Sequence, residues 1–166
     1  MMIQWYGCNG ARSALEGTLR GERTPVHPFF TFVSGRKSLE IENSKGQLDS
    51  VIKGIKLSRF INYSEPIWIY NGDTVRLIDP YDYNYLYGDF DGIIEVFNHT
   101  GNHWSFIDDL NVKNVVEKKR ISNYASTGLY GFKNLKLIFQ YINFYNNEKE
   151  YYVAPFYNTL ISNKKK

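Results

Sequence analysis

The feature that most constrains the fold lies in residues 46–72, where a helical pattern leads directly into a short apolar run. Basic side chains fall on the other faces of this predicted helix. The apolar side chains that recur at helical spacing are Leu48, Val51, Ile52, Ile55 and Phe60. Pro66 then introduces Ile67-Trp68-Ile69-Tyr70, an unbroken apolar run that ends at Asn71-Gly72. Such a run is typical of a central strand covered on both faces, as parallel strands are. The sequence therefore predicts an α/β domain with a mixed, mainly parallel sheet and helices on both faces.

The rest of the chain supports this class with further strands and amphipathic helices. Strands are predicted at residues 92–97, 112–117 and 125–132, with a short one at 105–107. Helices are predicted at residues 135–142 and 153–161, and Pro155 falls in the first turn of the second helix, where its missing N–H costs little. Residues 1–44 form the least defined part of the sequence, with one expected strand at 29–33 and otherwise irregular structure.

Length and composition predict one soluble domain in a reducing compartment. The chain has 166 residues, 43% of them hydrophobic, and a net charge of +3 that a lysine tail at residues 164–166 accounts for. A neutral body gives no reason to expect a nucleic-acid partner. The single cysteine, Cys8, excludes an internal disulfide and fits a cytoplasmic protein. No apolar run reaches membrane-spanning length, so no membrane partner is expected.

Two polar positions flank the predicted helix and strand of residues 46–72. Asp73 comes just after the carboxyl end of the buried strand, where ligands bind in open α/β sheets. Its carboxylate can either hold Mg²⁺, a cation that takes oxygen ligands, or cap the following turn. Gly46 opens the preceding helix, where free N–H groups can meet a flat base, although a plain N-terminal turn explains a glycine equally well.

A second group of polar residues lies near residues 123–132. Glu117-Lys118-Lys119 follows a predicted strand, and the next strand carries Thr127-Gly128, a small residue where a ligand or another backbone can come close. An ammonium suits a phosphate as a compact charge, and a carboxylate accepts hydrogen bonds from pairs of hydroxyls. Without the Thr127-Gly128 strand, a solvated run of charges would be the better interpretation of this group.

Taken together, these motifs resemble the sugar-phosphate nucleotidylyltransferases, which make nucleotide sugars from a sugar 1-phosphate and a nucleoside triphosphate. The resemblance covers about residues 46–161 and implies a Rossmann-like fold of the nucleotide-diphospho-sugar transferase type, here truncated. It rests on Gly46, on Asn71-Gly72-Asp73, on Val115-Val116-Glu117-Lys118, on the strand of residues 123–132 and on Tyr151-Tyr152-Val153-Ala154-Pro155.

The resemblance implies roles for individual residues. Asp73 would hold a catalytic Mg²⁺, and Gly46 and Gly72 would bind the nucleotide with it. Glu117 would bind sugar hydroxyls, Lys118 would bind the sugar phosphate as a catalytic residue, and Thr127-Gly128 would complete the acceptor site. Many relatives carry a second metal-binding aspartate at the place of Pro155, which cannot ligate, and Glu150 is the nearest carboxylate that could replace it.

The resemblance also implies that the chain is incomplete at both ends. Relatives begin with a strand and a glycine-rich loop that cradles the triphosphate. Residues 7–12 (Gly-Cys-Asn-Gly-Ala-Arg) share some features of this loop, but no strand of Val/Ile type is evident before them. Thr24-Pro25 stands too close to Gly46 for the Lys-Pro pair of the family, and the chain ends before the usual closing strand and helix. The expected divisions are residues 1–44 as a poorly defined segment, 45–162 as a partial nucleotidyltransferase domain and 163–166 as a basic tail.

Three functions follow as alternatives. The first is nucleotidyl transfer to a sugar phosphate in surface polysaccharide precursor synthesis, since relatives with such substrates share the Tyr-Val-Ala-Pro pattern; activity of this chain is doubtful without the loop. The second is a glycosyltransferase that uses a nucleotide sugar, with metal on Asp73 or on Asp89 and Asp91, although the Asp89-Phe90-Asp91 pattern fits a turn cap better. The third is a non-catalytic sugar-nucleotide-binding module.

Overall fold

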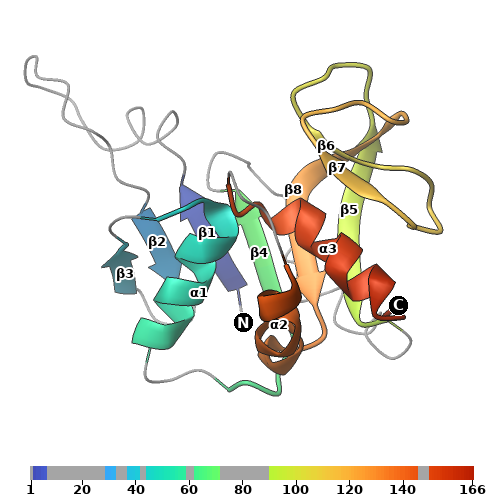
Figure 1. The fold of residues 1–166 in the computed structure, drawn as a ribbon. Helices are drawn as coiled ribbons and strands as arrows, with labels where there is room; N and C mark the ends of the chain where they lie inside the picture. The colour runs from blue at the N-terminus through green and yellow to red at the C-terminus, as the bar shows by residue number, and fades with distance from the viewer. Residues whose placement is uncertain are drawn as a thin grey trace, which may run out of the picture.

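The computed structural model describes residues 2–6, 29–32, 37–41, 44–58, 62–71, 90–145 and 150–166. These residues form one mixed sheet with three α-helices and a short 3-10 helix (Figure 1). In chain order the elements are β1 Met2–Tyr6, β2 Phe29–Phe32, β3 Lys37–Glu40, α1 Gln47–Leu57, β4 Ile67–Asn71, β5 Gly92–Asn98, β6 Ser105–Ile107, β7 Val115–Glu117, β8 Tyr124–Phe132, α2 Leu135–Tyr141, the 3-10 helix η2 Ile142–Phe144 and α3 Val153–Ser162.

The strand directions correct one prediction about the sheet. The strands lie in the order β3-β2-β1-β4-β8-β6-β7, and β5 pairs with the other edge of β8. Among the described strands, β1 and β4 are the only parallel pair, and every other ladder is antiparallel. The prediction of a mixed sheet is confirmed, but the prediction that it is mainly parallel is wrong for this part of the chain. The apolar run that led to it reports burial on two faces, and burial does not determine the direction of the neighbouring strands.

The described helices all contribute to the core on one face of the sheet. Ile67 and Ile69 of β4 pack in one apolar cluster with residues from α1, α2 and α3, and Figure 1 shows these helices in front of the sheet. Trp68 points to the opposite face, where it packs with Leu129. Both faces of β4 are therefore buried as predicted, but helices cover only one of them within the described residues.

The N-terminal segment contains more sheet than its sequence indicates. Strand β1 lies between β2 and β4, in parallel register with β4, and β3 pairs with β2. Only one strand was expected here, at residues 29–33, and it corresponds to β2. The sequence of β1, Met-Ile-Gln-Trp-Tyr, holds a single β-branched residue, so it lacks the Val/Ile signal by which a central strand is recognised.

Most later elements fall where the apolar pattern places them. The main difference is β7, which begins at Val115 although a strand was predicted from Val112. The cause is a turn centred on Asp108, whose carboxylate accepts hydrogen bonds from the N–H groups of Lys113 and Asn114 at 3.0 and 3.1 Å. Asn158 of α3 fixes the start of β7. Its amide oxygen accepts a hydrogen bond of 2.8 Å from the N–H of Val115, and its amide nitrogen donates one of 2.7 Å to the C=O of the same residue.

Strand β8 changes its neighbour partway along its length, which leaves a gap between β4 and β6 along one edge of β8. One edge of β8 pairs with β4 through residues 129–132 and with β6 at Ala125. Residues 126–128 therefore lie between the ends of β4 and β6. On the other edge, Ile94 of β5 pairs with Tyr130 of β8, and Val96 pairs with Ser126. An advance of two residues along β5 therefore matches an advance of four along β8, so β8 bulges here.

Candidate active site

Polar residues from six parts of the chain gather around this gap. The first group joins β8, β4 and α1 through a glycine. Gly128 has a φ of +85°, and a Cβ atom there would lie 2.6 Å from Nδ2 of Asn71, the last residue of β4. The Asn71 side chain also accepts a hydrogen bond of 2.6 Å from Nε2 of Gln47, at the start of α1. The close approach that the sequence predicts at Gly128 is therefore made by Asn71.

The second group connects the carboxylate of Glu117 to β8. Ser105 Oγ donates a hydrogen bond to the Glu117 carboxylate and lies 3.3 Å from the hydroxyl of Tyr130. The Tyr130 hydroxyl also bonds Ser126, whose Oγ accepts the Gly128 N–H at 3.0 Å. A chain of hydrogen bonds thus runs from Glu117 to the bulge of β8, and it fixes the position of the carboxylate.

Burial raises the pKa of the Glu117 carboxyl. The Ser105 hydrogen bond and the charge of Lys118 act in the opposite direction, and the nearby Glu150 carboxylate adds to the rise. A raised pKa in a half-buried carboxylate beside a lysine is a feature that functional sites share. The same carboxylate is held in one orientation by Ser105, which suits it to accept hydrogen bonds from a ligand.

Lys118 adopts an unusual backbone conformation, with a φ of +53°. Its N–H donates to the carbonyl of Trp104 at 3.0 Å, and its Nζ donates to the hydroxyl of Tyr152 at 2.9 Å. The ammonium also lies 4.9 Å from the centre of the Tyr152 ring. The Tyr152 hydrogen bond raises the pKa of Lys118, so the side chain remains a cation. A non-glycine residue in this conformation costs free energy, and such strain is concentrated at functional sites.

Residues 150–152 connect Lys118 to the start of α1. Tyr152 donates a hydrogen bond to the Glu150 carboxylate. Between them, the Tyr151 backbone bonds Lys45 O and Leu48 N at 2.9 and 2.8 Å. A Cβ on Gly46, whose φ is +135°, would lie 2.8 Å from the backbone N and O of Tyr151. The close approach at Gly46 is therefore made by the chain itself.

The structure brings most of the described candidate residues into one group. Glu117, Lys118, Gly128, Gly46 and Glu150 all take part in the hydrogen bonds and close contacts around the gap. The side chain of Thr127 does not join them. Its hydroxyl donates to Glu95 of β5, on the face of the sheet opposite Ser126.

The remaining candidates lie elsewhere or outside the described residues. Gly72, Asp73 and Asp89 fall in residues that the structure does not describe. Asp91 precedes β5, and its carboxylate accepts a hydrogen bond of 3.3 Å from the N–H of Lys166, a residue far away in the chain. Within the described part of the chain, no group of three or more His, Cys, Asp or Glu side chains could hold a metal ion. Glu150 supplies oxygen donors of the kind that Mg²⁺ takes, but one of them already accepts the Tyr152 hydroxyl.

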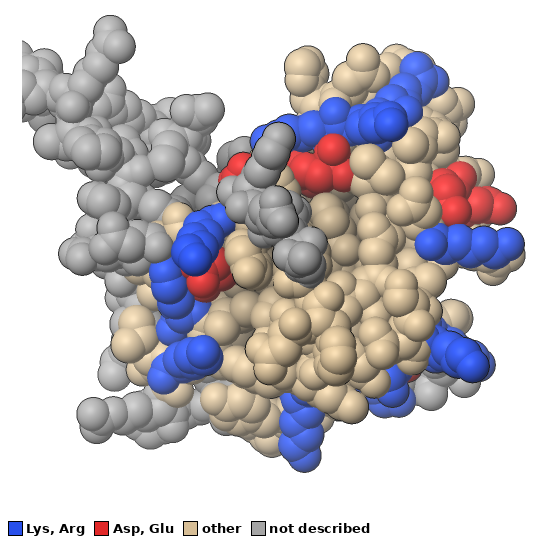
Figure 2. Space-filling view, in the orientation of Figure 1, with Lys and Arg blue, Asp and Glu red and all other residues tan. Residues whose placement is uncertain are grey.

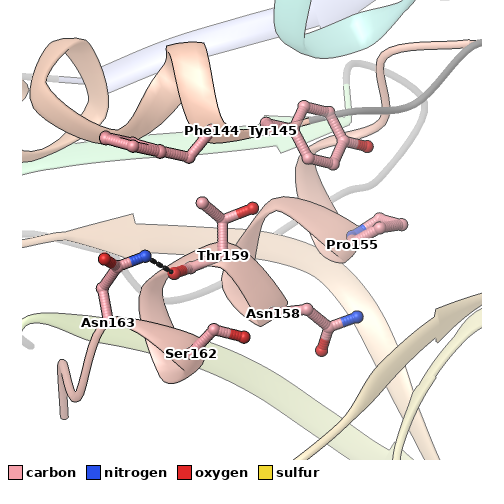
Figure 3. A pocket seen from close by; sticks show the side chains of 7 residues that line it. All are labelled: Phe144, Tyr145, Pro155, Asn158, Thr159, Ser162 and Asn163. Carbon is pink, nitrogen blue, oxygen red and sulfur yellow. Dashed lines mark hydrogen bonds between the residues drawn. The ribbon is translucent and has the colours of Figure 1, made fainter.

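A pocket of about 370 Å³ lies apart from this group (Figure 3). It is lined by residues of α3 and of the segment after α2, with Pro155 among them, and none of the residues around the gap lines it. The position at which the resemblance places a second metal-binding aspartate therefore belongs to this pocket.

Figure 2 shows basic side chains spread over the visible face without a single large patch. No described helix is long and apolar enough to cross a membrane.

Four residues of the site were not singled out from the sequence. They are Asn71, Gln47, Ser105 and Tyr152, and each acts by contacting a residue far away in the chain. Asn71 and Tyr152 carried a usable signal, because each lies in a motif on which the resemblance rests. The other two look like ordinary polar residues of a helix and a strand.

The Glu117→Gln variant is expected to change how stability depends on pH. Because folding raises the pKa of Glu117, the stability that this residue contributes is fully present at low pH and is lost as the pH rises through the raised value. Glutamine does not ionise. The stability of the variant relative to the parent should therefore increase between pH 4 and pH 8, measured by urea unfolding at each pH. Glu65→Gln, which removes an exposed carboxylate, is the control, and a difference that stays constant with pH would contradict the expectation.

Solved structures of sugar-nucleotide pyrophosphorylases match this fold. The nucleoside-diphosphate-sugar pyrophosphorylase from Vibrio cholerae RC9 matches with a TM-score of 0.65 and 29% identity, over 76% of this chain and 57% of that one. A protein assigned as a glucose-1-phosphate thymidylyltransferase from Bacillus anthracis, in complex with sucrose, matches with a TM-score of 0.57 and 16% identity, over 74% and 51%. A UDP-glucose pyrophosphorylase complexed with UDP-glucose matches with a TM-score of 0.58 and 18% identity, over 75% and 53%.

No protein-family model matches the sequence, and no curated protein matches it. The chain spans between 51% and 57% of the length of the solved relatives described above. The match to the Vibrio cholerae protein has the highest sequence identity of the three. Over about three quarters of its length, this chain has the fold of the sugar-phosphate nucleotidylyltransferases and is structurally related to the nucleoside-diphosphate-sugar pyrophosphorylases, which confirms the resemblance seen in its sequence.

Proposed function

We propose that this chain carries the acceptor half of a sugar-phosphate nucleotidylyltransferase site, which acts in the synthesis of nucleotide sugars for surface polysaccharide. The observation that carries the proposal is the pair Glu117 and Lys118, held beside the gap in a fold related to pyrophosphorylases. The UDP-glucose bound to one solved relative supports a nucleotide sugar as product.

The acceptor pair is suited to a phosphorylated sugar. The Lys118 ammonium has three donors and spends one on Tyr152, so two are left for a phosphate. The Glu117 carboxylate, already oriented by Ser105, can accept hydrogen bonds from sugar hydroxyls. A sugar phosphate bound here would present a phosphate oxygen to the α-phosphorus of a nucleoside triphosphate, and pyrophosphate would leave on the opposite side.

The nucleotide would bind on the other side of the gap. Gly46 and the start of α1 lie there, and Gly72 and Asp73 follow Asn71 in the sequence. Asp73, with Glu150 as a second candidate, would hold Mg²⁺, which neutralises charge on the phosphates when it is bound. Because β1 runs parallel to β4, residues 7–12 follow a strand end on the same side of the sheet as Asn71.

The proposal is tested by measuring ligand binding and pyrophosphate release separately. Binding of glucose 1-phosphate, UDP-glucose and UTP with Mg²⁺ can be followed by NMR titration, and turnover can be followed with a coupled pyrophosphate assay. We expect the sugar phosphate to bind and pyrophosphate release to be undetectable, because the sequence shows no clear glycine-rich loop to hold the triphosphate. Robust release would mean that residues 7–12 complete the enzyme. Nucleoside diphosphate release from UDP-glucose would indicate a glycosyltransferase, and binding of UDP-glucose alone a non-catalytic module.

Replacing Lys118 by alanine is expected to weaken the binding of glucose 1-phosphate by about 1.5–3 kcal/mol, the usual value of a hydrogen bond to a charged group. The fold should be unaffected, because the side chain is exposed and, among the described residues, its one hydrogen bond is to Tyr152. Isothermal titration measures the change. Lys119→Ala removes the same charge from the next residue and should have a much smaller effect; equal losses in the two variants would assign the binding to general electrostatics.

A further inference from the structure

Tyr152 lies between the acceptor lysine and a carboxylate. Its hydroxyl accepts a hydrogen bond from Lys118 Nζ at 2.9 Å and donates its own proton to Glu150. The ring lies beneath the ammonium as well, 4.9 Å from ring centre to Nζ. A single side chain thus meets Lys118 in two ways, and Glu150 determines which way the hydroxyl proton points.

The backbone at Tyr152 is held firmly enough to act as a support. Its carbonyl accepts a hydrogen bond of 3.2 Å from the buried Tyr145, and Tyr151 is bonded on both sides to the start of α1. Tyr152 also provides the N-terminal boundary of α3. Lys118, by contrast, is an exposed side chain, and ordering a free lysine costs about 1.5–2 kcal/mol of side-chain entropy.

Lys118 has no ion pair with a carboxylate in the described part of the chain, although Glu117 and Glu150 are close enough to influence its pKa. This matters for a residue that must bind phosphate. A lysine paired with a carboxylate would have to break the pair or share its charge, whereas a neutral phenol oxygen orients the ammonium and leaves its charge available.

We propose that Tyr152 is the positioning residue for Lys118, and that Glu150 serves by orienting the Tyr152 hydroxyl. This inference rests on the proposed function for the identity of the ligand, a sugar 1-phosphate, but the geometry it describes belongs to the free protein. It also gives Glu150 a role other than metal binding, since one of its two carboxylate oxygens accepts the phenol proton.

The test is a double-mutant cycle on glucose 1-phosphate affinity, with Tyr152→Phe and Lys118→Ala. Phenylalanine keeps the ring and its contact with the ammonium, so the fold should be retained. Tyr152→Phe alone should weaken binding about 3- to 10-fold, the effect of losing one hydrogen bond. In the Lys118→Ala background it should have no further effect. Tyr151→Phe is the matched control, because it removes a neighbouring phenol that does not contact Lys118.

A second readout separates this inference from the proposed function. The pKa of Lys118, followed by NMR of the lysine side chain in the ligand-free protein, should fall in Tyr152→Phe because its largest cause is removed. If no sugar phosphate binds the parent protein, the proposed function fails and this measurement still tests the positioning. An unchanged Lys118 pKa, or an equal loss of affinity in both backgrounds of the cycle, would overturn the role of Tyr152.

Discussion

Replacing Gly128 by alanine is expected to destabilise the protein by about 2–5 kcal/mol and to disrupt the gap. About 1–2 kcal/mol arises because a residue with a Cβ is strained at the positive φ of this position. A further 1–3 kcal/mol arises from overpacking, because the new Cβ would lie 2.6 Å from the Asn71 side chain. Asn71 cannot simply turn away without losing its hydrogen bond with Gln47. Urea unfolding measures the total.

The two contributions can be separated with a second substitution. Combining Gly128→Ala with Asn71→Ala removes the crowding but keeps the backbone strain, so the double variant should recover the overpacking part only. Gly101→Ala is the control, because that glycine lies in a loop and a Cβ there would meet only the His99 ring, at 3.1 Å. Full stability of Gly128→Ala would mean that β8 does not bulge as described.

Replacing Gly46 by alanine is expected to cost about 3–5 kcal/mol. Its φ of +135° and ψ of −178° lie in a region that is open essentially to glycine alone. The added Cβ would also lie 2.8 Å from backbone atoms of Tyr151, which cannot move without breaking the bonds to Lys45 and Leu48. The change should therefore release residues 150–152 from α1 as well as lower stability.

Two measurements check the Gly46 prediction. Urea unfolding gives the loss of stability, and hydrogen exchange at the N–H groups of Tyr151 and Leu48 reports whether the segment is released. Faster exchange at these two positions together is expected. Slow exchange with a large loss of stability would place the damage elsewhere in α1, and a fully stable variant would contradict the close packing against Tyr151.

The sequence predicted the positions of the helices and of most strands because apolar periodicity reports burial. It did not predict the direction of β8 relative to β4, because a strand buried on both faces has the same pattern in either direction. It also missed β1, whose five residues carry little of the β-branched pattern and gain their place from pairing with β2 and β4. Pairing over long stretches of chain is a tertiary property that a local pattern does not contain.

The candidate site was predictable where residue type and spacing alone carry the chemistry. Glu117 and Lys118 are recognisable as a pair, and Gly128 as a place of close approach. The partners that orient them, Ser105 and Tyr152, lie 12 and 34 residues away from the residues they bind. The direction of the Thr127 side chain could not be predicted from the sequence. The bulge that places Gly128 in the gap leaves the Thr127 hydroxyl on the far face of the sheet, where it bonds Glu95.

The bulge of β8 also determines the dimensions of the site. Strand β4 is attached to β8 on one side of residues 126–128, and the hairpin of β6 and β7 is attached near the other side. Asn71 is the last residue of β4, and Glu117 and Lys118 lie at the end of β7. A change in the bend of β8 at residues 126–128 would therefore change the distance between these two groups of residues. In the proposed function, the separation between nucleotide and sugar phosphate therefore depends on the curvature of one strand, and a substitution that straightened β8 would alter it without touching either group.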